Sequence, residues 1–399
     1  MSKLRIGVYL RGLYLEGGGI PRLVLDLCDY LARFGHDTTL ATWDTRDVPR
    51  AWLGGGEGLP RVVRIEPPAP LGWMNGDLTR QLTAFVERCD VVHTEVIWDP
   101  SVARVASIAK RLGRPYVLTP NGMLDDWSLK QGALKKRVYF SLAGRRVLDG
   151  AAFIHCASRG ELEQTKKHHP RTPGVAIPYV FDLESFRRLP GPGAAREKFA
   201  IPEDGVPTIL FISRVHYKKR PEALIRAAAL LRDRGVGFRV LLAGPGDQAY
   251  MASLRALISN LGLDEQVRFI GMVTSEFKAS LYQACDVMVL PTSQENFGIV
   301  YFESLACGTP VVTTKGTDTW TELQESGGAS IIDEGTIGGG GIEGAIADVL
   351  AEMIKDRGRM RAMGDSGRAW VMRNLEPARV VEQYIAMYAS AMEGRRQHG

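Results

Sequence analysis

The stretch PTSQENFGIVYFESLACGTPVV, residues 291–312, decides the fold. It follows the segment DVMVL at 286–290, which has the pattern of a buried parallel strand, and it contains a helix pattern at 298–307 that ends at Gly308. A strand, a loop and a helix in this order are typical of an open α/β sheet, which binds its ligand beyond the carboxyl ends of the strands. The loop at 293–298 is therefore the expected edge of a ligand-binding cleft.

Two glutamates lie eight positions apart in this stretch. Glu295 falls in the loop, whereas the neighbours of Glu303, among them Phe302 and Leu305, describe a helix packed in the interior. A pair with this spacing is ordinarily a loop acid and a solvated helix residue. Here an unpaired buried carboxylate would be costly, so the context favours two carboxylates that contact one ligand in the cleft.

The composition is that of a soluble protein with two domains. The 399 residues, with 45% hydrophobic content, exceed the size of a usual single core. The five cysteines are scattered and form no C-x-x-C pair, which argues against a disulfide framework or a zinc site and favours the reducing cytoplasm. The N-terminal apolar run is too short for a signal peptide, and no run of about 20 apolar residues suits a membrane span.

The charge pattern narrows the ligands. The net charge of +5 is modest, and no basic run is interleaved with aromatic residues, so nucleic acid is not an expected partner. A phosphate-bearing small molecule or an anionic membrane surface is compatible with this charge.

Buried strand patterns alternate with helix patterns through both halves of the chain, which predicts parallel sheets with helices on both faces. The strands are expected at residues 4–10, 38–42, 91–94, 116–119, 153–156, 208–213, 239–243, 267–270, 287–290 and 310–313. The segment 171–205 is rich in proline and glycine and reads as a linker. We therefore expect two Rossmann-like, doubly wound domains, residues 1–180 and 181–376, and a C-terminal helix, 377–399, that crosses back to the first domain.

A basic loop, RVHYKKRP from Arg214 to Pro221, follows the strand expected at 208–213. Pro221 suits the first turn of the helix that comes next. Arg214 and Lys219 would then flank a strand-to-helix turn, where a guanidinium and an ammonium group together could neutralise a diphosphate. A solvated basic loop would have the same sequence.

Gly17, Gly18 and Gly19 lie between the strand pattern at 4–10 and the helix pattern at 22–34. Glycines just before a helix allow an anion to approach the backbone closely. The motif is neither G-x-G-x-x-G nor a Walker sequence, so it gives little support to NAD or ATP as a cofactor.

Two further polar loops follow strands of the first domain: HTE at 93–95 and PNGM at 120–123. Their side chains are expected to face the crevice between the domains. His93 could equally be a buried histidine with satisfied hydrogen bonds, and Asn121 could simply form a turn.

The helix pattern at 132–149, GALKKRVYFSLAGRRVLD, combines basic and apolar residues. Such a helix can lie on an anionic bilayer. An ordinary amphipathic surface helix has the same pattern and is the simpler interpretation.

Taken together, these motifs resemble those of the retaining glycosyltransferases of family 4, which have the GT-B fold. The resemblance rests on ENFGIVYFE at 295–303, ACGTPVV at 306–312, SRVHYKK at 213–219, the glycines at 17–19, DVVH at 90–93 and TPNGML at 119–124. It runs through almost the full length. It implies that two Rossmann-like domains face each other across a cleft, with a nucleotide-sugar on the C-terminal domain and the acceptor entering from the N-terminal domain.

The resemblance also implies roles for single residues. Arg214 and Lys219 would bind the donor diphosphate, and Gly18 would approach it from the other domain. Glu303 would accept hydrogen bonds from the ribose hydroxyls, and Glu295 would hold hydroxyls of the sugar. The other implied donor contacts are backbone amides or lie beside the base, at Asn296, Phe297, Gly298 and Val273. The residues implied in catalysis are Arg214, Lys219, Glu295 and His93.

Two positions depart from the family's pattern. Family members commonly have histidine at the position of Asn121, in the sequence P-H-G, and that histidine touches the sugar near its C6 hydroxyl. Asparagine differs from histidine in reach and acidity. This difference suggests that the donor carries an unusual or 6-deoxy sugar. Relatives frequently have H-x-H where this chain has His93 and Glu95. Glu95 could instead orient an acceptor or be structural.

The resemblance implies a hexosyltransferase that moves a hexose or deoxyhexose from a nucleoside-diphosphate sugar to a glycan or lipid-linked acceptor, in the assembly of bacterial surface polysaccharide such as lipopolysaccharide or exopolysaccharide. The sequence has no D-x-D motif and no evident side-chain nucleophile, so we expect front-face attack without a metal and no cofactor besides the donor substrate. The expected location is the cytoplasm, with peripheral contact at the inner membrane. A nucleotide-sugar epimerase and a catalytically silent nucleotide-sugar sensor are the alternatives.

Overall fold

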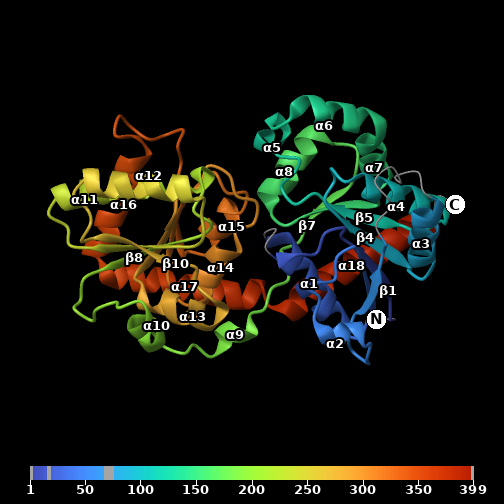
Figure 1. Cartoon of the computed structure of the whole chain (residues 1–399), viewed down its shortest axis with the longest axis horizontal. Helices are drawn as coiled ribbons and strands as arrows, with labels where there is room; N and C mark the ends of the chain where they lie inside the picture. The colour runs from blue at the N-terminus through green and yellow to red at the C-terminus, as the bar shows by residue number, and fades with distance from the viewer. Residues whose placement is uncertain (1–2, 16–18, 67–75, 397–399) are drawn as a thin grey trace. The chain divides into compact units, whose positions relative to one another are not determined.

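Two compact units make up the chain, each with its own sheet (Figure 1). The computed structural model describes residues 3–15, 19–66 and 76–396. The first unit comprises residues 1–182 and 377–399, and the second unit comprises residues 183–376.

The sheet of the first unit has seven parallel strands. They are β1 Arg5–Tyr9, β2 Asp37–Thr42, β3 Arg61–Arg64, β4 Val91–Glu95, β5 Tyr116–Thr119, β6 Phe153–Cys156 and β7 Gly174–Ala176. Their order is β3-β2-β1-β4-β5-β6-β7, so the direction in which strands are added reverses between β1 and β4. In doubly wound sheets, ligands bind at the carboxyl ends of the strands beside such a reversal.

Helices cover both faces of this sheet. They are α1 Gly19–Arg33, α2 Arg50–Leu53, α3 Gly76–Glu87, α4 Pro100–Arg111, α5 Asp126–Lys130, α6 Ala133–Tyr139, the π-helix η3 Phe140–Gly144, α7 Arg145–Gly150, α8 Arg159–His168 and α18 Pro377–Arg396.

Successive side chains of β1 point to opposite faces of the sheet, and the core of the first unit therefore has two layers. Val8 packs with α1 and α18 in one layer, whereas Tyr9 packs with α3 and α4 in the other. A Cβ atom at Gly7 would lie 2.5 Å from the Cys89 sulfur and 2.8 Å from the Phe85 ring. Only glycine therefore allows α3 to pack this closely against the strand.

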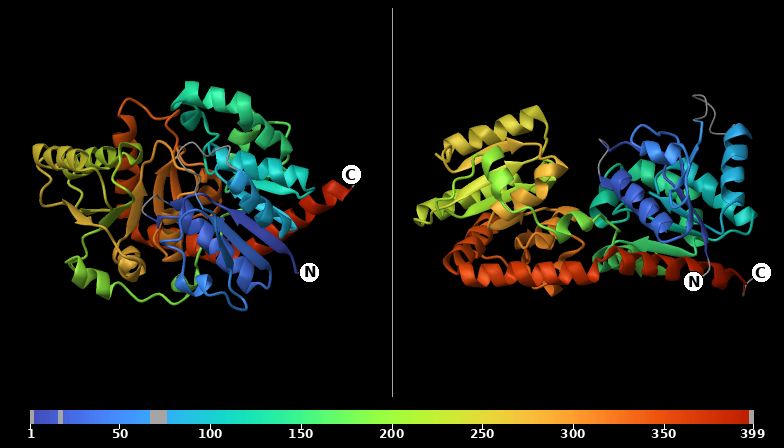
Figure 2. Two further views of the ribbon diagram at one scale, coloured as in Figure 1. Left: turned by 45° about the vertical axis from the view of Figure 1, so that its right-hand side comes forward. Right: turned by 90° about the horizontal axis from the view of Figure 1, so that it is seen from below.

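Helix α18 brings the end of the chain back to the first unit. Figure 2 shows it, in red, lying along one face of the first sheet, where it contacts β4 and β5. Its residues Val380, Tyr384 and Tyr388 are almost completely buried. The first unit is therefore completed by residues that follow the second unit in sequence.

The sheet of the second unit has six parallel strands. They are β8 Thr208–Ile212, β9 Arg239–Ala243, β10 Val267–Gly271, β11 Val287–Leu290, β12 Val311–Thr314 and β13 Ala329–Ile332. Their order is β10-β9-β8-β11-β12-β13, with the reversal between β8 and β11.

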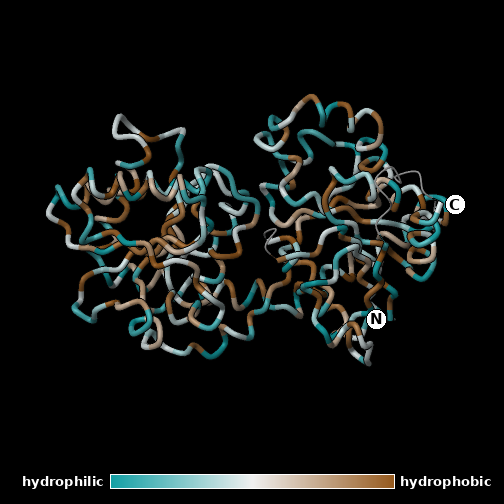
Figure 3. The backbone as a smooth tube through the Cα atoms, in the orientation of Figure 1, coloured by the Kyte–Doolittle hydropathy of each residue, from teal (hydrophilic) through white to brown (hydrophobic). Residues whose placement is uncertain are grey.

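The helices of the second unit lie on both sides of its sheet. They are α9 Glu184–Arg187, α10 Gly193–Lys198, the 3-10 helix η4 Tyr217–Lys219, α11 Pro221–Asp233, α12 Gln248–Asn260, α13 Ser275–Ala284, α14 Ile299–Ala306, α15 Trp320–Glu325, α16 Gly341–Lys355 and α17 Arg357–Asn374. Hydrophobic residues are concentrated in the middle of each unit, and hydrophilic residues lie mostly at its periphery (Figure 3).

The two parallel α/β sheets confirm the predicted fold class, and each of the ten predicted strands overlaps an observed strand. The sequence patterns missed β3, β7 and β13. Each of these three strands lies at the edge of its sheet.

Candidate active site

The carboxyl ends of β8 and β11 lie side by side, because these two strands pair in the second sheet. The loop after β8 ends in η4, and the loop after β11 leads into α14. The Lys218 carbonyl joins the two loops: it accepts hydrogen bonds from the Ser293 amide at 2.8 Å and from the hydroxyls of Thr292 and Ser293 at 3.1 Å. The basic motif and the first glutamate of the sequence analysis therefore belong to one site.

Lys219 and Glu295 form an ion pair at this edge. Lys219 Nζ lies 2.5 Å from Glu295 Oε2 and 3.4 Å from the Gln294 carbonyl oxygen. The Lys219 side chain is only 10% exposed and that of Glu295 is 24% exposed. An ammonium group has three protons to donate, so one donor of Lys219 is not used by these two bonds.

Arg214 lies just after β8 and is exposed. The next residue, Val215, forms a parallel bridge with Gly246 in the loop that follows β9. Between these loops, Gly244 has φ +129°, and a Cβ atom there would lie 1.8 Å from the Ser213 carbonyl oxygen. Only glycine permits this approach, which keeps the backbone beside Arg214 in place.

The loop before α14 turns at Gly298, which has φ +63°. A Cβ atom at this position would lie 2.3 Å from the Tyr301 ring and 3.0 Å from Glu295 Cγ. Asn296 and Phe297 lie in the same turn, the Asn296 amide 3.2 Å from Glu295 Oε1 and Phe297 almost fully buried. These three predicted donor contacts therefore lie in the turn that directly follows Glu295.

Glu303 lies on α14, is 7% exposed, and has two partners from α13. Lys278 Nζ lies 2.7 Å from its Oε1, and the Tyr282 hydroxyl donates to its Oε2 at 3.0 Å. Burial and the Glu303 charge raise the pKa of Tyr282 well above its usual range, so Tyr282 is a donor at every physiological pH. The ion pair with Lys278 and the hydrogen bond from Tyr282 thus offset the unfavourable desolvation of the buried Glu303 carboxylate. A carboxylate can accept about four hydrogen bonds, which leaves acceptor capacity for a ligand.

A third loop, residues 315–319 after β12, contacts the Glu295 loop. The Glu295 amide donates to the Gly316 carbonyl at 2.9 Å, the Glu295 carbonyl accepts from the Asp318 amide at 2.9 Å, and Thr319 Oγ1 donates to the Phe297 carbonyl at 3.1 Å. This loop was not among the predicted site residues. The signal for it is the segment KGTDT at 315–319, which begins two residues after the end of the strand predicted at 310–313.

Val273 lies two residues beyond β10, at the same edge of the sheet, and is half-buried. The preceding loop is attached to the β9 loop, because the Gly244 amide donates to the Gly271 carbonyl at 2.8 Å. Met272 beside it is 71% exposed.

In the first unit, His93 on β4 is fully buried and has both ring nitrogens occupied. Nδ1 lies 2.6 Å from the Tyr388 hydroxyl and Nε2 lies 2.5 Å from Thr119 Oγ1. Thr119 Oγ1 also lies 2.8 Å from His155 Nδ1, and His155 Nε2 lies 2.8 Å from the Ile177 carbonyl.

This chain of hydrogen bonds has one consistent direction. A carbonyl only accepts, so His155 carries its proton on Nε2 and accepts from Thr119, which in turn accepts from His93 Nε2. His93 Nδ1 then accepts from Tyr388. Burial, with the nearby His155, holds the pKa of His93 well below its usual range, and burial lowers that of His155 to about 4. His93 is thus a neutral core histidine with no exposed surface for a substrate, which matches the second of the two interpretations given to it.

Glu95 and Asn121 are joined in the same region. Asn121 Nδ2 donates to Glu95 Oε2 at 2.7 Å and to the Thr119 carbonyl at 3.1 Å, and Asn121 Oδ1 accepts from the Tyr179 hydroxyl at 2.6 Å. Glu95 is 4% exposed. Burial, helped by the charge of Glu161, raises the pKa of Glu95 to about 7 although Asn121 opposes the shift.

Both N–H groups of the Asn121 side chain are therefore used inside the first unit. A sugar hydroxyl could be met only by the remaining lone pair of Oδ1. The backbone of Asn121 is also unusual, since its φ of +55° lies in the left-handed region.

The structure thus brings Arg214, Lys219, Glu295 and the Asn296–Gly298 turn to one edge of the second sheet, and it links His93 to Asn121 through Thr119. Gly18 lies outside the described residues. Within the described ranges, no group of three or more His, Cys, Asp or Glu side chains is arranged to hold a metal ion. Within the same ranges, no helix combines the length and the apolar character needed to cross a membrane.

Comparison with known proteins gives matches over both units. The model of the group 1 glycosyl transferases matches residues 194–370, and that of the glycosyl transferase 4-like domain matches residues 18–179. The D-inositol 3-phosphate glycosyltransferase of Mycobacterium leprae is 30% identical over 319 residues, which cover 74% of this chain and 72% of that protein. Its counterpart in Kineococcus radiotolerans is 28% identical over 344 residues, covering 80% and 78%.

Solved structures share the fold. Anabaena HepE in complex with UDP and glucose has a TM-score of 0.77 at 17% identity and covers 97% of this chain and 100% of its own. WaaG, a glycosyltransferase involved in lipopolysaccharide biosynthesis, has a TM-score of 0.66 at 17% identity, with 98% of each chain covered. Because family models match most of both units and a relative at 30% identity spans most of the length, the chain belongs to the group 1 glycosyltransferases and has the GT-B fold.

Proposed function

We propose that this glycosyltransferase takes a hexose or deoxyhexose from a nucleoside-diphosphate sugar and transfers it to a hydroxyl of a glycan or lipid-linked acceptor, with retention of the anomeric configuration and without a metal or further cofactor. The observation that carries the proposal is the Lys219–Glu295 ion pair at the carboxyl edge of the second sheet, with the exposed Arg214 at the same edge. A cation pair for phosphates and a carboxylate for hydroxyls are the groups that such a donor needs.

The cations would act on the leaving group. As the bond to the sugar breaks, negative charge grows on the β-phosphate, and Arg214 and Lys219 would stabilise it. A preorganised donor of this kind is typically worth about 3 kcal/mol of the barrier. In the free protein Glu295 balances the Lys219 charge at 2.5 Å, which keeps the ammonium in position without a ligand.

The carboxylates would locate the donor. Glu295 would accept from sugar hydroxyls beside the amides of the Asn296–Gly298 turn, and Val273 would lie beside the base. Glu303 would accept from the ribose hydroxyls with the capacity that Lys278 and Tyr282 leave unused.

Retention would follow from front-face attack. The acceptor hydroxyl would approach on the side from which the nucleoside diphosphate leaves, and the departing phosphate oxygen would take its proton. His93 does not act as the nucleophile in this proposal, because it is fully buried and both of its nitrogens are occupied. Its part would be to position Thr119 and, through the Thr119 carbonyl, Asn121.

The names of similar proteins guide the choice of donor and acceptor. HepE was solved with UDP and glucose, which supports a UDP-sugar as the first donor to test. WaaG is involved in lipopolysaccharide biosynthesis, which supports a role in the assembly of bacterial surface polysaccharide. The location proposed for this role is the cytoplasm, at the inner face of the membrane. The D-inositol 3-phosphate glycosyltransferases make a phosphorylated cyclitol an acceptor worth including.

The test is donor turnover by the purified chain with and without acceptor. UDP- and GDP-sugars would be incubated with lipid-linked glycan acceptors and with inositol 3-phosphate, and the free nucleotide would be measured with the anomeric configuration of the product. Nucleotide release that requires acceptor, with retention, supports the proposal. Release without acceptor would indicate hydrolysis or epimerase chemistry, and tight donor binding without any release would indicate a sensor.

A further inference from the structure

Three large aliphatic side chains form a ridge on the surface of the first unit. Leu134 and Val138 on α6 and Leu142 on η3 are 77%, 53% and 68% exposed. Their spacing of four residues along one continuous helical run places them on one face. Single exposed aliphatic residues are ordinary, but a contiguous row marks a surface that meets an apolar partner.

Basic residues surround this ridge. The run from 133 to 150 contains five basic residues and one acidic residue, and four of the basic residues are exposed: Lys135, Arg137, Arg145 and Arg146. The single acid, Asp149, lies 3.4 Å from Arg145 Nε and is therefore paired. An apolar ridge flanked by cations is the pattern of a helix that lies on an anionic bilayer.

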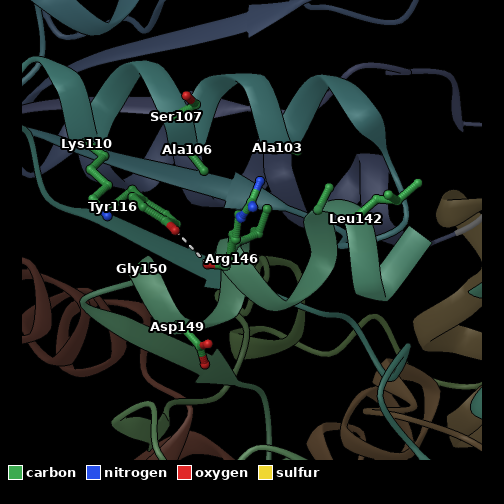
Figure 4. A pocket seen from close by; sticks show the side chains of 11 residues that line it. Ala103, Ala106, Ser107, Lys110, Tyr116, Leu142, Arg146, Asp149 and Gly150 are labelled. Carbon is green, nitrogen blue, oxygen red and sulfur yellow. Dashed lines mark hydrogen bonds between the residues drawn. The ribbon is translucent and has the colours of Figure 1, made fainter. Parts of the chain in front are cut away.

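A pocket of about 440 Å³ opens beside the ridge, between α4 and the η3–α7 segment (Figure 4). Ser107 and Lys110 of α4 line it, as do Arg146 and Asp149 of α7. Leu142 belongs both to the pocket lining and to the ridge. Two cations and a hydroxyl thus adjoin the apolar surface, and the one acid is held by Arg145.

The walls of the pocket are fixed by the fold. The Tyr116 hydroxyl donates to the Val147 carbonyl at 2.6 Å, the bond drawn in Figure 4, and so attaches α7 to β5. Lys136 donates to the Ser128 carbonyl and lies 5.2 Å from the Trp98 ring, which attaches α6. Between them η3 is a π-helix, a feature often found at functional sites.

We propose that this face docks on an anionic lipid bilayer, with the ridge Leu134, Val138 and Leu142 at the acyl boundary and a lipid phosphate in the pocket between Lys110, Arg146 and Ser107. The proposal rests on the proposed function in one respect only, since a lipid-linked acceptor would be met at such a surface. Guanidinium binds phosphate through paired hydrogen bonds and lysine binds it as a point charge. The pocket, at about 440 Å³, has room for a lipid headgroup beside two cations, and a protein partner would not require such a pocket next to the ridge.

The experiment is sedimentation of the full chain with vesicles. We expect binding to phosphatidylcholine vesicles that contain about one third phosphatidylglycerol, little binding to phosphatidylcholine alone, and weaker binding as salt is added. Inorganic phosphate separates the lipid from the free anion: if phosphate binds the pocket but the chain does not sediment with anionic vesicles, the lipid assignment is wrong.

Two sets of variants test the ridge and the pocket separately. Arg146→Gln and Lys110→Gln should each weaken binding about five-fold, which corresponds to about 1 kcal/mol per basic residue near the surface. The double variant Leu134→Gln/Leu142→Gln should lose binding at salt concentrations that the pocket variants still tolerate. Matched controls are Arg80→Gln, whose side chain is 81% exposed on α3, and Leu53→Gln, 55% exposed on α2; both should bind like the unmodified chain.

Equal binding by the ridge, pocket and control variants would overturn the proposal. So would a change from dimer to monomer in the ridge variant without any vesicle binding, because the ridge would then be covered by a second copy. Vesicle binding needs no donor and no turnover. A chain that binds anionic vesicles but transfers no sugar would refute the proposed function alone, and one that transfers sugar to a soluble acceptor but ignores vesicles would refute the docking surface alone.

Discussion

Lys219 is the residue on which the proposed chemistry depends most. Its ammonium group is nearly buried, is held by Glu295 at 2.5 Å, and retains one donor for a phosphate. Lys219→Ala should lower kcat by about 10² to 10³, the usual loss when one preorganised donor to a developing charge is removed. The measurement is turnover of the UDP-sugar, with circular dichroism to establish that the variant is folded.

Lys355→Ala is the matched control for this prediction, because Lys355 is exposed at the end of α16 in the same unit. It should turn over at the normal rate. Near-normal turnover by a folded Lys219→Ala protein would remove Lys219 from the mechanism.

Glu303 tests the donor-binding half of the proposal. Glu303→Gln should weaken UDP binding about tenfold, because hydrogen bonds to a charged group contribute about 1.5–3 kcal/mol each. Lys278→Ala removes the ion-pair partner of Glu303 but not the carboxylate, so it should weaken binding less. Calorimetric titration with UDP measures both, and equal losses in the two variants would indicate that Glu303 only supports the packing of α13 on α14.

Glu95 is a buried carboxylate whose pKa is raised to about 7 from about 4.5, chiefly by burial. The folded state therefore holds this proton more tightly than the unfolded state does. The contribution of Glu95 to the free energy of unfolding should fall by about 3 kcal/mol as the pH rises from about 4.5 to about 7, and above that pH the full penalty applies.

Glu95→Gln should remove this dependence. Relative to the unmodified chain, the variant should gain free energy of unfolding between pH 5 and pH 8, as measured by urea unfolding at both pH values. Glu57→Gln changes an exposed glutamate of the same unit and should show no such gain. If the difference between Glu95→Gln and the unmodified chain is the same at pH 5 and pH 8, Glu95 keeps an ordinary pKa.

Single residues also show what the sequence could not decide. Asn121 was placed correctly after the end of β5, whereas the HTE segment at 93–95, predicted as a loop, is part of the buried strand β4. The partners of both side chains come from elsewhere in the chain: Tyr388 on α18 for His93 and Tyr179 after β7 for Asn121. His93 and Tyr388 are separated by 295 positions in the sequence, and Asn121 and Tyr179 by 58. Hydrogen bonds across such separations leave no local sequence pattern. The structure was therefore needed to show that the Asn121 side-chain amide points into the first unit.

At the scale of elements, α14 has a glycine just beyond each end, and the two glycines do different work. Gly298 and Gly308 both have positive φ, at 63° and 79°. A Cβ atom at Gly308 would meet nothing within 4 Å, whereas one at Gly298 would lie 2.3 Å from the Tyr301 ring. Gly308→Ala thus carries only the backbone cost, about 1 kcal/mol.

Gly298→Ala should lower the free energy of unfolding by more than Gly308→Ala does, because Tyr301 must move as well. It should also weaken UDP-sugar binding, since the turn holds Glu295, whereas Gly308→Ala should leave donor affinity unchanged. Urea unfolding and donor titration of the pair measure the two effects. Equal donor affinity in both variants would mean that the turn does not shape the donor site.

The three strands that were not predicted from the sequence, β3, β7 and β13, were missed for a common reason. Central strands such as β8 and β11 are buried along their whole length and read as apolar runs. β3, β7 and β13 lie at sheet edges and are three or four residues long; β3 and β7 have no fully buried residue and β13 has one. Their length does not set them apart, since β11 also has only four residues. They lack the run of buried apolar residues that identifies a central strand, because one side of each has no neighbouring strand.

At the scale of the whole molecule, the chain passes from the first unit to the second after Asp182 and returns after Glu376. The proposed contacts to the nucleotide, Arg214, Lys219 and Glu303, all belong to the second unit, and α18 belongs to the first. A ligand that binds only the folded second unit should therefore raise the stability of that unit, by an amount set by its concentration relative to its Kd.

Thermal unfolding with nucleotides tests this for the intact chain. UDP at about 100 times its Kd should stabilise the binding-competent state by about 2.7 kcal/mol, visible as a higher melting temperature of the second unit. GDP and ADP at the same concentration serve as controls for the base, and Lys219→Ala should lose most of the UDP effect because the diphosphate loses a cation. A larger rise in melting temperature with GDP than with UDP would identify GDP as the nucleotide of the donor. No rise with any nucleoside diphosphate would contradict the donor site at β8, β11 and α14.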